Sequence, residues 1–165
     1  SLDNGARAAT GEIIAQTDAD TYVPKNWLAV INQHFQDEPI VGLTGTVEFA
    51  HTSWFFKLLS KYGYTAYARL LFFFRKTIFT GMNFAISKEV YDKIGGINRD
   101  LLSNEDVDLG IRAGKEGKVI FAIDLIAYTS ARRIEKAPLG FLWNHAINFF
   151  YYLLFHKSRH FENIR

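Results

Sequence analysis

Apolar and polar positions follow two alternating patterns along the chain. Short runs rich in apolar or β-branched residues predict strands, at 12–17, 40–49, 77–86 and 118–123. Apolar residues at helical spacing predict helices, at 24–38, 53–74, 87–94, 104–116 and 139–156. Strands that alternate with helices indicate an α/β layer architecture, in which ligands bind outside the carboxyl ends of the strands.

Several residues predict where these elements begin, end or bend. Ser87 and Asn104 are expected to cap the helices that follow them, and Gly95-Gly96 is expected to stop the first of the two. Gly42 and Gly45 interrupt a β-branched run, which indicates a close approach of neighbouring groups or a bulge.

Composition excludes several classes of protein. The chain has 165 residues and no cysteine, which excludes a disulfide scaffold and a thiolate zinc site. A formal charge of +2 is too balanced for a dedicated nucleic-acid binder, and 48% hydrophobic residues exclude disorder. No signal peptide is evident at the start. The uncharged stretch 137–155 has polar residues at its middle, so it suits a helix on a core or membrane surface better than a bilayer span.

Two carboxylates, Asp18 and Asp20, follow the first predicted strand with one residue between them. Hard oxygen ligands at this spacing can hold Mg²⁺ or Mn²⁺, which takes its remaining ligands from water and phosphates. Because aspartate is also a preferred turn residue, a simple strand-end turn is the alternative.

A second group of acids opens the predicted helix at 104–116. Asp106 could take a proton from an acceptor hydroxyl as a general base, with Glu105 beside it. Acids that stabilise a helix N-terminus are the alternative. Gly81, next to Asn83, would allow a ligand to come close, or it marks a β-bulge.

The order of these motifs resembles that of the family 2 inverting glycosyltransferases of the GT-A fold. The stretches that carry the resemblance run from Leu2 to Arg133 and are LDNGARAATGEIIAQTDADT, TGMNFAISKEVYDKIGGINRDLLSNEDVDLGIRAGKEGKVIF and YTSARR. The resemblance implies a Rossmann-like mixed sheet with flanking helices. It also implies transfer of a sugar from a nucleoside-diphosphate sugar to an acceptor hydroxyl, with inversion.

The resemblance also implies a role for each motif. Asp106 would be the general base, and Glu105 would orient the acceptor or the base. Asp20, with Asp18, would hold Mn²⁺ or Mg²⁺ and the donor. The remaining matches are donor-lining residues, a helical arginine and a basic segment over the diphosphate: Gly81, Asn83, Arg112, Arg132 and Arg133. For the last pair a solvated basic turn is the alternative.

Some features depart from the family pattern. The family's opening β-α-β units are not found, so residues 1–136 are expected to be the C-terminal portion of a catalytic domain that is incomplete at its N-terminus. The Q-x-x-R-W motif of processive synthases is absent, and no His follows the last strand as a third metal ligand. His145 is the nearest later candidate, with simple packing as its alternative. Residues 137–165 are expected to form an amphipathic aromatic helix and tail.

Two aromatic segments, 54–74 and 143–151, have basic residues nearby. Core packing is the default interpretation, and an exposed surface that touches a membrane or a lipid-linked acceptor is the alternative. The expected partners are therefore a nucleotide-sugar donor and a saccharide or lipid-linked acceptor, with a membrane surface or a second copy of the chain as further candidates. The expected location is the cytoplasm, including the cytoplasmic face of the membrane.

Two competing functions remain open at this point. The chain could be a catalytically inactive fragment that associates through an exposed sheet edge or apolar surface. It could also be a metal-dependent phosphatase or nucleotidyltransferase that uses the same acids.

Overall fold

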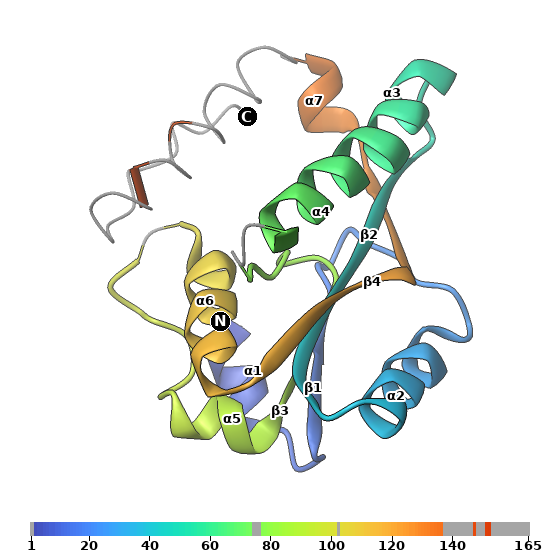
Figure 1. The fold of residues 1–165 in the computed structure, drawn as a ribbon. Coiled ribbons are helices and arrows are strands. Elements are labelled where there is room, and N and C mark those ends of the chain that lie inside the picture. Colours follow the sequence, from blue (N-terminus) through green and yellow to red (C-terminus); the bar gives the residue numbers. More distant parts are fainter. Residues whose placement is uncertain (1, 74–76, 102, 137–146, 148–150, 153–165) are drawn as a thin grey trace.

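The computed structural model describes residues 2–73, 77–101, 103–136, 147 and 151–152, and it contains a four-stranded mixed sheet (Figure 1). The strands are β1 (Ile13–Gln16), β2 (Ile40–Ala50), β3 (Phe84–Ser87) and β4 (Lys118–Ser130). Their order is β1-β3-β2-β4; β3 is antiparallel to β1 and β2, whereas β2 and β4 are parallel. The predicted mixed sheet with flanking helices is confirmed.

Helices connect these strands. They are α1 (Leu2–Ala8), α2 (Trp27–Asp37), α3 (Trp54–Leu58), the π-helix η1 (Leu59–Tyr64), α4 (Thr65–Phe73), α5 (Lys88–Lys93), α6 (Glu105–Glu116) and α7 (Arg132–Lys136). The short helices α1 and α7 were not predicted. Helix α2 begins at Trp27 rather than at Pro24, and most of the helix predicted at 139–156 lies outside the described residues.

The expected helix boundaries are confirmed only in part. Gly95 and Gly96 stop α5 with φ angles of 80° and 72°, a conformation that favours glycine. Ser87 and Asn104 stand before their helices as expected, but neither side chain makes a capping hydrogen bond. Asn104 instead adopts a left-handed backbone with φ 62°. The entry into α6 is therefore shaped by the backbone of Asn104 and not by a side-chain cap.

Helices cover both faces of the sheet (Figure 1). On one face Trp27 and Ile31 of α2 pack with buried residues of the sheet, among them Ala85. On the other face Ile86 packs with α5 and α6 in a second core cluster. Ala85 and Ile86 face opposite cores because successive side chains of a strand alternate between the two sides.

Two glycines of α6 explain why the strand predicted at 77–86 begins only at Phe84. A Cβ atom at Gly110 would lie 2.4 Å from the backbone nitrogen of Phe79, and one at Gly114 would lie 2.1 Å from Oγ1 of Thr77. The Thr77 hydroxyl donates a hydrogen bond to the Gly110 carbonyl at 3.2 Å. Residues 77–79 thus pack directly on the helix backbone and do not join the sheet.

The pairing of β2 with β4 contains the bulge that Gly45 suggested. Gly45 pairs with Ala122, but the next residue, Thr46, pairs with Ile126. A Cβ atom at Gly45 would lie 2.1 Å from the Leu125 carbonyl oxygen, so only glycine leaves room for this crossing. Beyond the bulge β4 continues to Ser130, well past the predicted end at 123.

The aromatic segment at 54–73 forms one long helix from α3 through η1 to α4 (Figure 1). Core packing, the default interpretation for this segment, is wrong for Trp54 and Phe55, because both side chains are exposed. None of the helices in the described part of the chain is long and apolar enough to cross a membrane.

Candidate active site

The carboxyl end of β1 and the entry into β3 lie side by side. The antiparallel pairing of β1 and β3 ends with Gln16 opposite Phe84. Asp18 and Asp20 therefore leave the sheet at the point where Gly81 and the residues after it approach it. This is the edge of an α/β sheet at which ligands bind.

The turn that carries the two aspartates is fixed at both ends. The Thr21 N–H donates to the Asp18 carbonyl at 3.1 Å. Tyr22 then exchanges two backbone hydrogen bonds of 2.9 Å with Tyr128 of β4, and the two rings stack with centroids 5.0 Å apart. The Asp18–Asp20 turn is thereby held against the outer half of β4, with both carboxylates exposed.

The residues at this turn fit a divalent cation. Asp18 and Asp20 offer hard oxygen donors. The hydroxyls of Thr17 and Thr21 beside them are buried and have no hydrogen-bond partner among the described residues. Within the same ranges no group of three or more His, Asp or Glu gathers. Such a set suits a cation that completes its shell with phosphates and water, as Mg²⁺ and Mn²⁺ do.

Asp106 contacts Gly81, another of the expected site residues. The Gly81 N–H donates to Oδ2 of Asp106 at 2.6 Å, and the Val107 N–H donates to Oδ1 at 2.9 Å. Desolvation by the surrounding protein is the main cause that raises the pKa of Asp106 to about 6; the charge of Glu105 adds a smaller rise, and the two backbone hydrogen bonds oppose it. A carboxyl with this pKa is mostly ionised at neutral pH and is basic enough to accept a proton.

Two hydroxyl residues beside Asp106 were missed by the sequence reasoning. Tyr64 of η1 forms a hydrogen bond with the Thr80 hydroxyl, one residue before Gly81. Burial raises the pKa of Tyr64, and the charge of Asp106 contributes to the rise. The position of Thr80 next to Gly81 was a usable signal, whereas nothing in the sequence points from η1 to this site.

Asn83, which was expected to line the donor, lies inside the protein and joins neighbouring elements. Its side chain is fully buried, with 0% exposed. Its Nδ2 donates to the carbonyls of Thr46 and Leu125 at 2.9 and 2.8 Å, and its Oδ1 accepts from the Trp27 indole at 2.9 Å. The amide therefore ties α2, β2 and β4 together below the site.

The structure places the predicted basic residues in two different settings. Arg132 is exposed at the start of α7, directly after β4, and the side chain of Arg133 lies outside the described residues, as does His145. Arg112 holds the turn after α5, because it donates to the carbonyls of Ile94 and Gly96 at 2.8 Å each. It also pairs with Asp108 at 2.7 Å, so its role here is structural.

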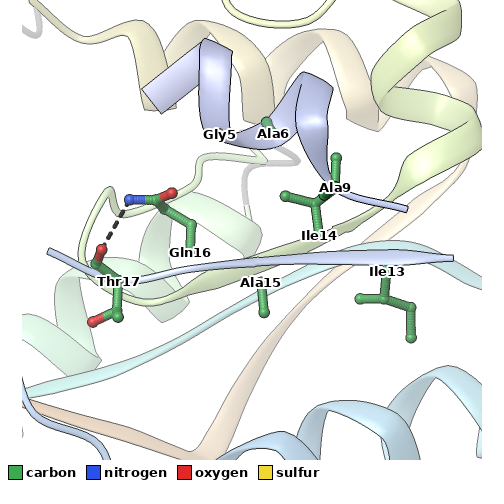
Figure 2. A pocket seen from close by; sticks show the side chains of 8 residues that line it. All are labelled: Gly5, Ala6, Ala9, Ile13, Ile14, Ala15, Gln16 and Thr17. Carbon is green, nitrogen blue, oxygen red and sulfur yellow. Dashed lines mark hydrogen bonds between the residues drawn. The ribbon is translucent and has the colours of Figure 1, made fainter. Parts of the chain in front are cut away.

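A shallow hollow of about 590 Å³ lies along β1, beside the aspartate turn (Figure 2). It is lined by side chains and backbone without charge: Gly5, Ala6, Ala9, Ile13, Ile14, Ala15, Gln16 and Thr17. Because no Lys or Arg side chain is among these lining residues, the hollow lacks the charged groups that bind a diphosphate. It lies instead beside the outer edge of β1, which is an edge strand of the sheet.

Comparison with known proteins places the chain in a family. The profile described as Glycosyl transferase family 2 matches residues 1–95, more than half of the chain. The chain belongs to this family. A search of curated proteins found no significant match to this family 2 chain.

Among solved structures, a mannosyltransferase from Pyrobaculum calidifontis in complex with GDP-Man and Mn²⁺ has a similar fold, with a TM-score of 0.50 and 21% identity. The match covers 88% of the family 2 chain but only 42% of the mannosyltransferase. At this identity the likeness supports the GT-A-type fold.

Proposed function

We propose that the chain forms part of a catalytic domain that transfers a sugar from a nucleoside-diphosphate sugar to an acceptor hydroxyl, with inversion at the anomeric carbon. The observation that carries the proposal is the Asp106 carboxyl, which accepts a hydrogen bond from Gly81 and whose pKa is raised to about 6. Gly81 comes shortly before β3, which pairs with the strand that leads into the Asp18–Asp20 turn. Family membership and the fold shared with a mannosyltransferase solved with GDP-Man and Mn²⁺ support it.

In the proposed reaction Asp106 accepts the proton of the acceptor hydroxyl. The hydroxyl oxygen attacks the anomeric carbon from the face opposite the diphosphate, the new glycosidic bond forms, and the nucleoside diphosphate leaves with the electrons of the broken bond. The N–H groups of Gly81 and Val107 hold the two oxygens of the base in place. Desolvation keeps the base strong, and the charge of Glu105 adds a smaller rise to the pKa of Asp106.

The donor would be held at the turn after β1. Asp18 and Asp20 would bind Mn²⁺ or Mg²⁺, whose positive charge stabilises the leaving diphosphate. Arg132 and Arg133, at the start of α7, would add charge-assisted hydrogen bonds to the same group. The acceptor would be a saccharide or a lipid-linked sugar that approaches from the Asp106 side.

Calorimetry of donor binding tests this assignment. Asp20→Ala should abolish the Mn²⁺-dependent part of nucleotide-sugar binding, whereas Asp37→Ala, which removes an exposed carboxylate at the end of α2, should leave it unchanged. Unchanged Mn²⁺-dependent binding in Asp20→Ala would refute the metal role. Release of phosphate from plain nucleotides, without sugar transfer, would favour a phosphatase or nucleotidyltransferase instead.

The hollow along β1 supports a second candidate function, association through the sheet edge. The outer edge of β1 has no neighbouring strand among the described residues, and an unpaired edge can accept a strand from another molecule. A catalytically inactive fragment would then assemble by pairing two such edges. The mass in solution separates the candidates: a dimer without donor affinity supports assembly, and a monomer that binds donor contradicts it.

A further inference from the structure

Most of the large apolar side chains that the described residues expose lie on the helix from α3 to α4. Eight of the eleven are there: Trp54, Phe55, Leu58, Leu59, Tyr62, Tyr67, Leu70 and Phe73. The other three, Tyr22, Leu28 and Ile123, come from separate elements. A contiguous apolar surface of this kind marks an interaction site, whereas scattered residues need no explanation.

Burial along this helix repeats every four residues. Positions 56, 60, 64, 68 and 72 form an inner row that is buried or partly buried. Positions 54, 58, 62, 66 and 70, two residues away and so on the opposite side, form an outer row that is exposed throughout. A step of four overshoots an α-helical turn by about 40°, and the π-helix η1 compensates because it winds more residues into each turn.

Basic residues lie beside the outer row, and the helix itself contains no acidic residue. Lys57, Lys61 and Arg69 share a third row, one residue from the inner one, and all are exposed. The sequence contains no Asp or Glu between Glu48 and Glu89. Lys61 lies 3.9 Å from Glu48, and its ammonium also lies 5.9 Å from the centroid of the Tyr62 ring. The surface is therefore apolar along its centre and positive along one side.

We propose that this surface, the outer row with its basic side row, docks the protein on an anionic lipid bilayer. An amphipathic helix that lies in the membrane interface carries aromatic and aliphatic residues on one face and Lys or Arg beside them, as here. Trp and Tyr favour the same interfacial region because each has an apolar ring and a polar tip. The inner row stays packed on the protein, so the helix lies flat on the bilayer.

The docking would place the bilayer close to the candidate active site. Tyr64, on the inner row, forms a hydrogen bond with Thr80, and Gly81 next to it binds Asp106. The side of the helix that faces the base and the side that faces lipid are thus separated by one helix diameter, about 10 Å. If the proposed function holds, this placement favours an acceptor carried on a lipid; the docking itself does not rest on that function.

Vesicle flotation of the whole chain tests the apolar row. The protein should float with vesicles of phosphatidylcholine mixed with phosphatidylglycerol. Leu58→Glu combined with Tyr62→Glu changes two exposed side chains, and it should weaken binding about a hundredfold because charge is costly below the headgroups. Leu28→Glu is the matched control: Leu28 is 65% exposed on α2, and its substitution should leave binding unchanged.

The basic row has its own signature. Lys57→Gln combined with Lys61→Gln should weaken binding to the anionic vesicles by about tenfold or more, since each basic residue near such a surface contributes about 1 kcal/mol. The double variant Lys25→Gln, Lys115→Gln removes two exposed charges elsewhere and should have little effect. Vesicles of phosphatidylcholine alone carry no net charge, so they should bind the wild-type protein and both double lysine variants weakly and equally.

Three results would overturn the proposal. The first is that the wild-type protein does not float with anionic vesicles, or that the double variant Leu58→Glu, Tyr62→Glu floats as well as the wild type does. The second is a dimer in lipid-free solution that this variant dissociates, which would assign the surface to a second copy. The third is slow hydrogen exchange and a shielded Trp54 in lipid-free monomer, which would assign it to residues 137–165. None of these depends on sugar transfer, so failure of the proposed function is detected separately.

Discussion

Two aspartates in different regions of the molecule have pKa values that are shifted in opposite directions. Asp3 of α1 is 3% exposed and accepts hydrogen bonds from Arg7, Arg99 and the Tyr91 hydroxyl, the last at 2.8 Å. These partners hold the pKa of Asp3 well below its usual range. Asp106 of α6 accepts hydrogen bonds from backbone N–H groups, and desolvation raises its pKa to about 6.

The comparison shows that the balance between charged partners and desolvation decides the pKa of a carboxyl group. The two arginines stabilise the charge of Asp3, which ties α1 to the turns that follow α5. Backbone N–H groups position Asp106 without supplying a full positive charge. They therefore oppose the effect of desolvation only in part, and the pKa of Asp106 stays at about 6. The pKa of one carboxyl is therefore lowered, and that of the other is raised to about 6.

The largest expected effect is on the chemistry of Asp106. Asp106→Asn should lower turnover by about a thousandfold, because a general base contributes roughly 10²- to 10⁴-fold. Donor binding measured by calorimetry should persist, and the free energy of unfolding should stay equal or rise, because a desolvated charge is removed. Full turnover in this variant would contradict the base assignment.

Asp3→Asn should produce the reverse pattern. It should lower the free energy of unfolding by about 2 kcal/mol, because hydrogen bonds between charged groups are lost, while transfer by the folded protein is kept. Urea unfolding measures this, with Asp37→Asn as an exposed control. Because the folded pKa of Asp3 is depressed, the difference should be complete at neutral pH and disappear as pH falls below the usual aspartate range. A difference that persists unchanged in acid would refute the ionic origin.

Gly81→Ala should disturb the base without removing it. The new Cβ would lie 3.3 Å from Oδ2 of Asp106, so the carboxylate has to shift by a few tenths of an ångström. Such a misplacement should lower turnover about tenfold with little change in donor binding. Gly5→Ala, where nothing lies within 4 Å of the added atom, serves as the control in the same assay. Equal turnover in the two variants would mean that the Gly81 contact does not position the base.

Strand periodicity predicted the α/β layers, and the resemblance assigned Gly81 and Asp106 to one expected site. The hydrogen bond between Gly81 and Asp106 was not predicted, because it joins positions 25 residues apart. The sequence also could not predict that 77–79 would leave the sheet, since that depends on Gly110 and Gly114 of a helix thirty or so residues away. The same limit applies to Asn83, which looks like a site residue in the sequence but is enclosed by Trp27 and two strands.

The C-terminal part shows a similar limit. Residues 137–165 were expected to form a separate amphipathic segment, and most of them lie outside the described residues. Tyr152, which is described, is buried, and its hydroxyl donates to Asp108 at 2.6 Å. Asp108, two residues after the candidate base, is thus shared between Arg112 and Tyr152. A pairing that joins positions 44 residues apart leaves no trace in local patterns.

The smallest expected effect concerns how Glu105 tunes Asp106. Turnover should fall on the acid side with an apparent pKa near 6, because the base must be ionised. Since the negative charge of Glu105 raises the pKa of Asp106, Glu105→Gln should lower that pKa and move the acid limb a few tenths of a unit to lower pH. Glu12→Gln, an exposed change beside β1, should not move it. A shift toward higher pH in Glu105→Gln would mean that Glu105 acts on the acceptor rather than through the charge of the base.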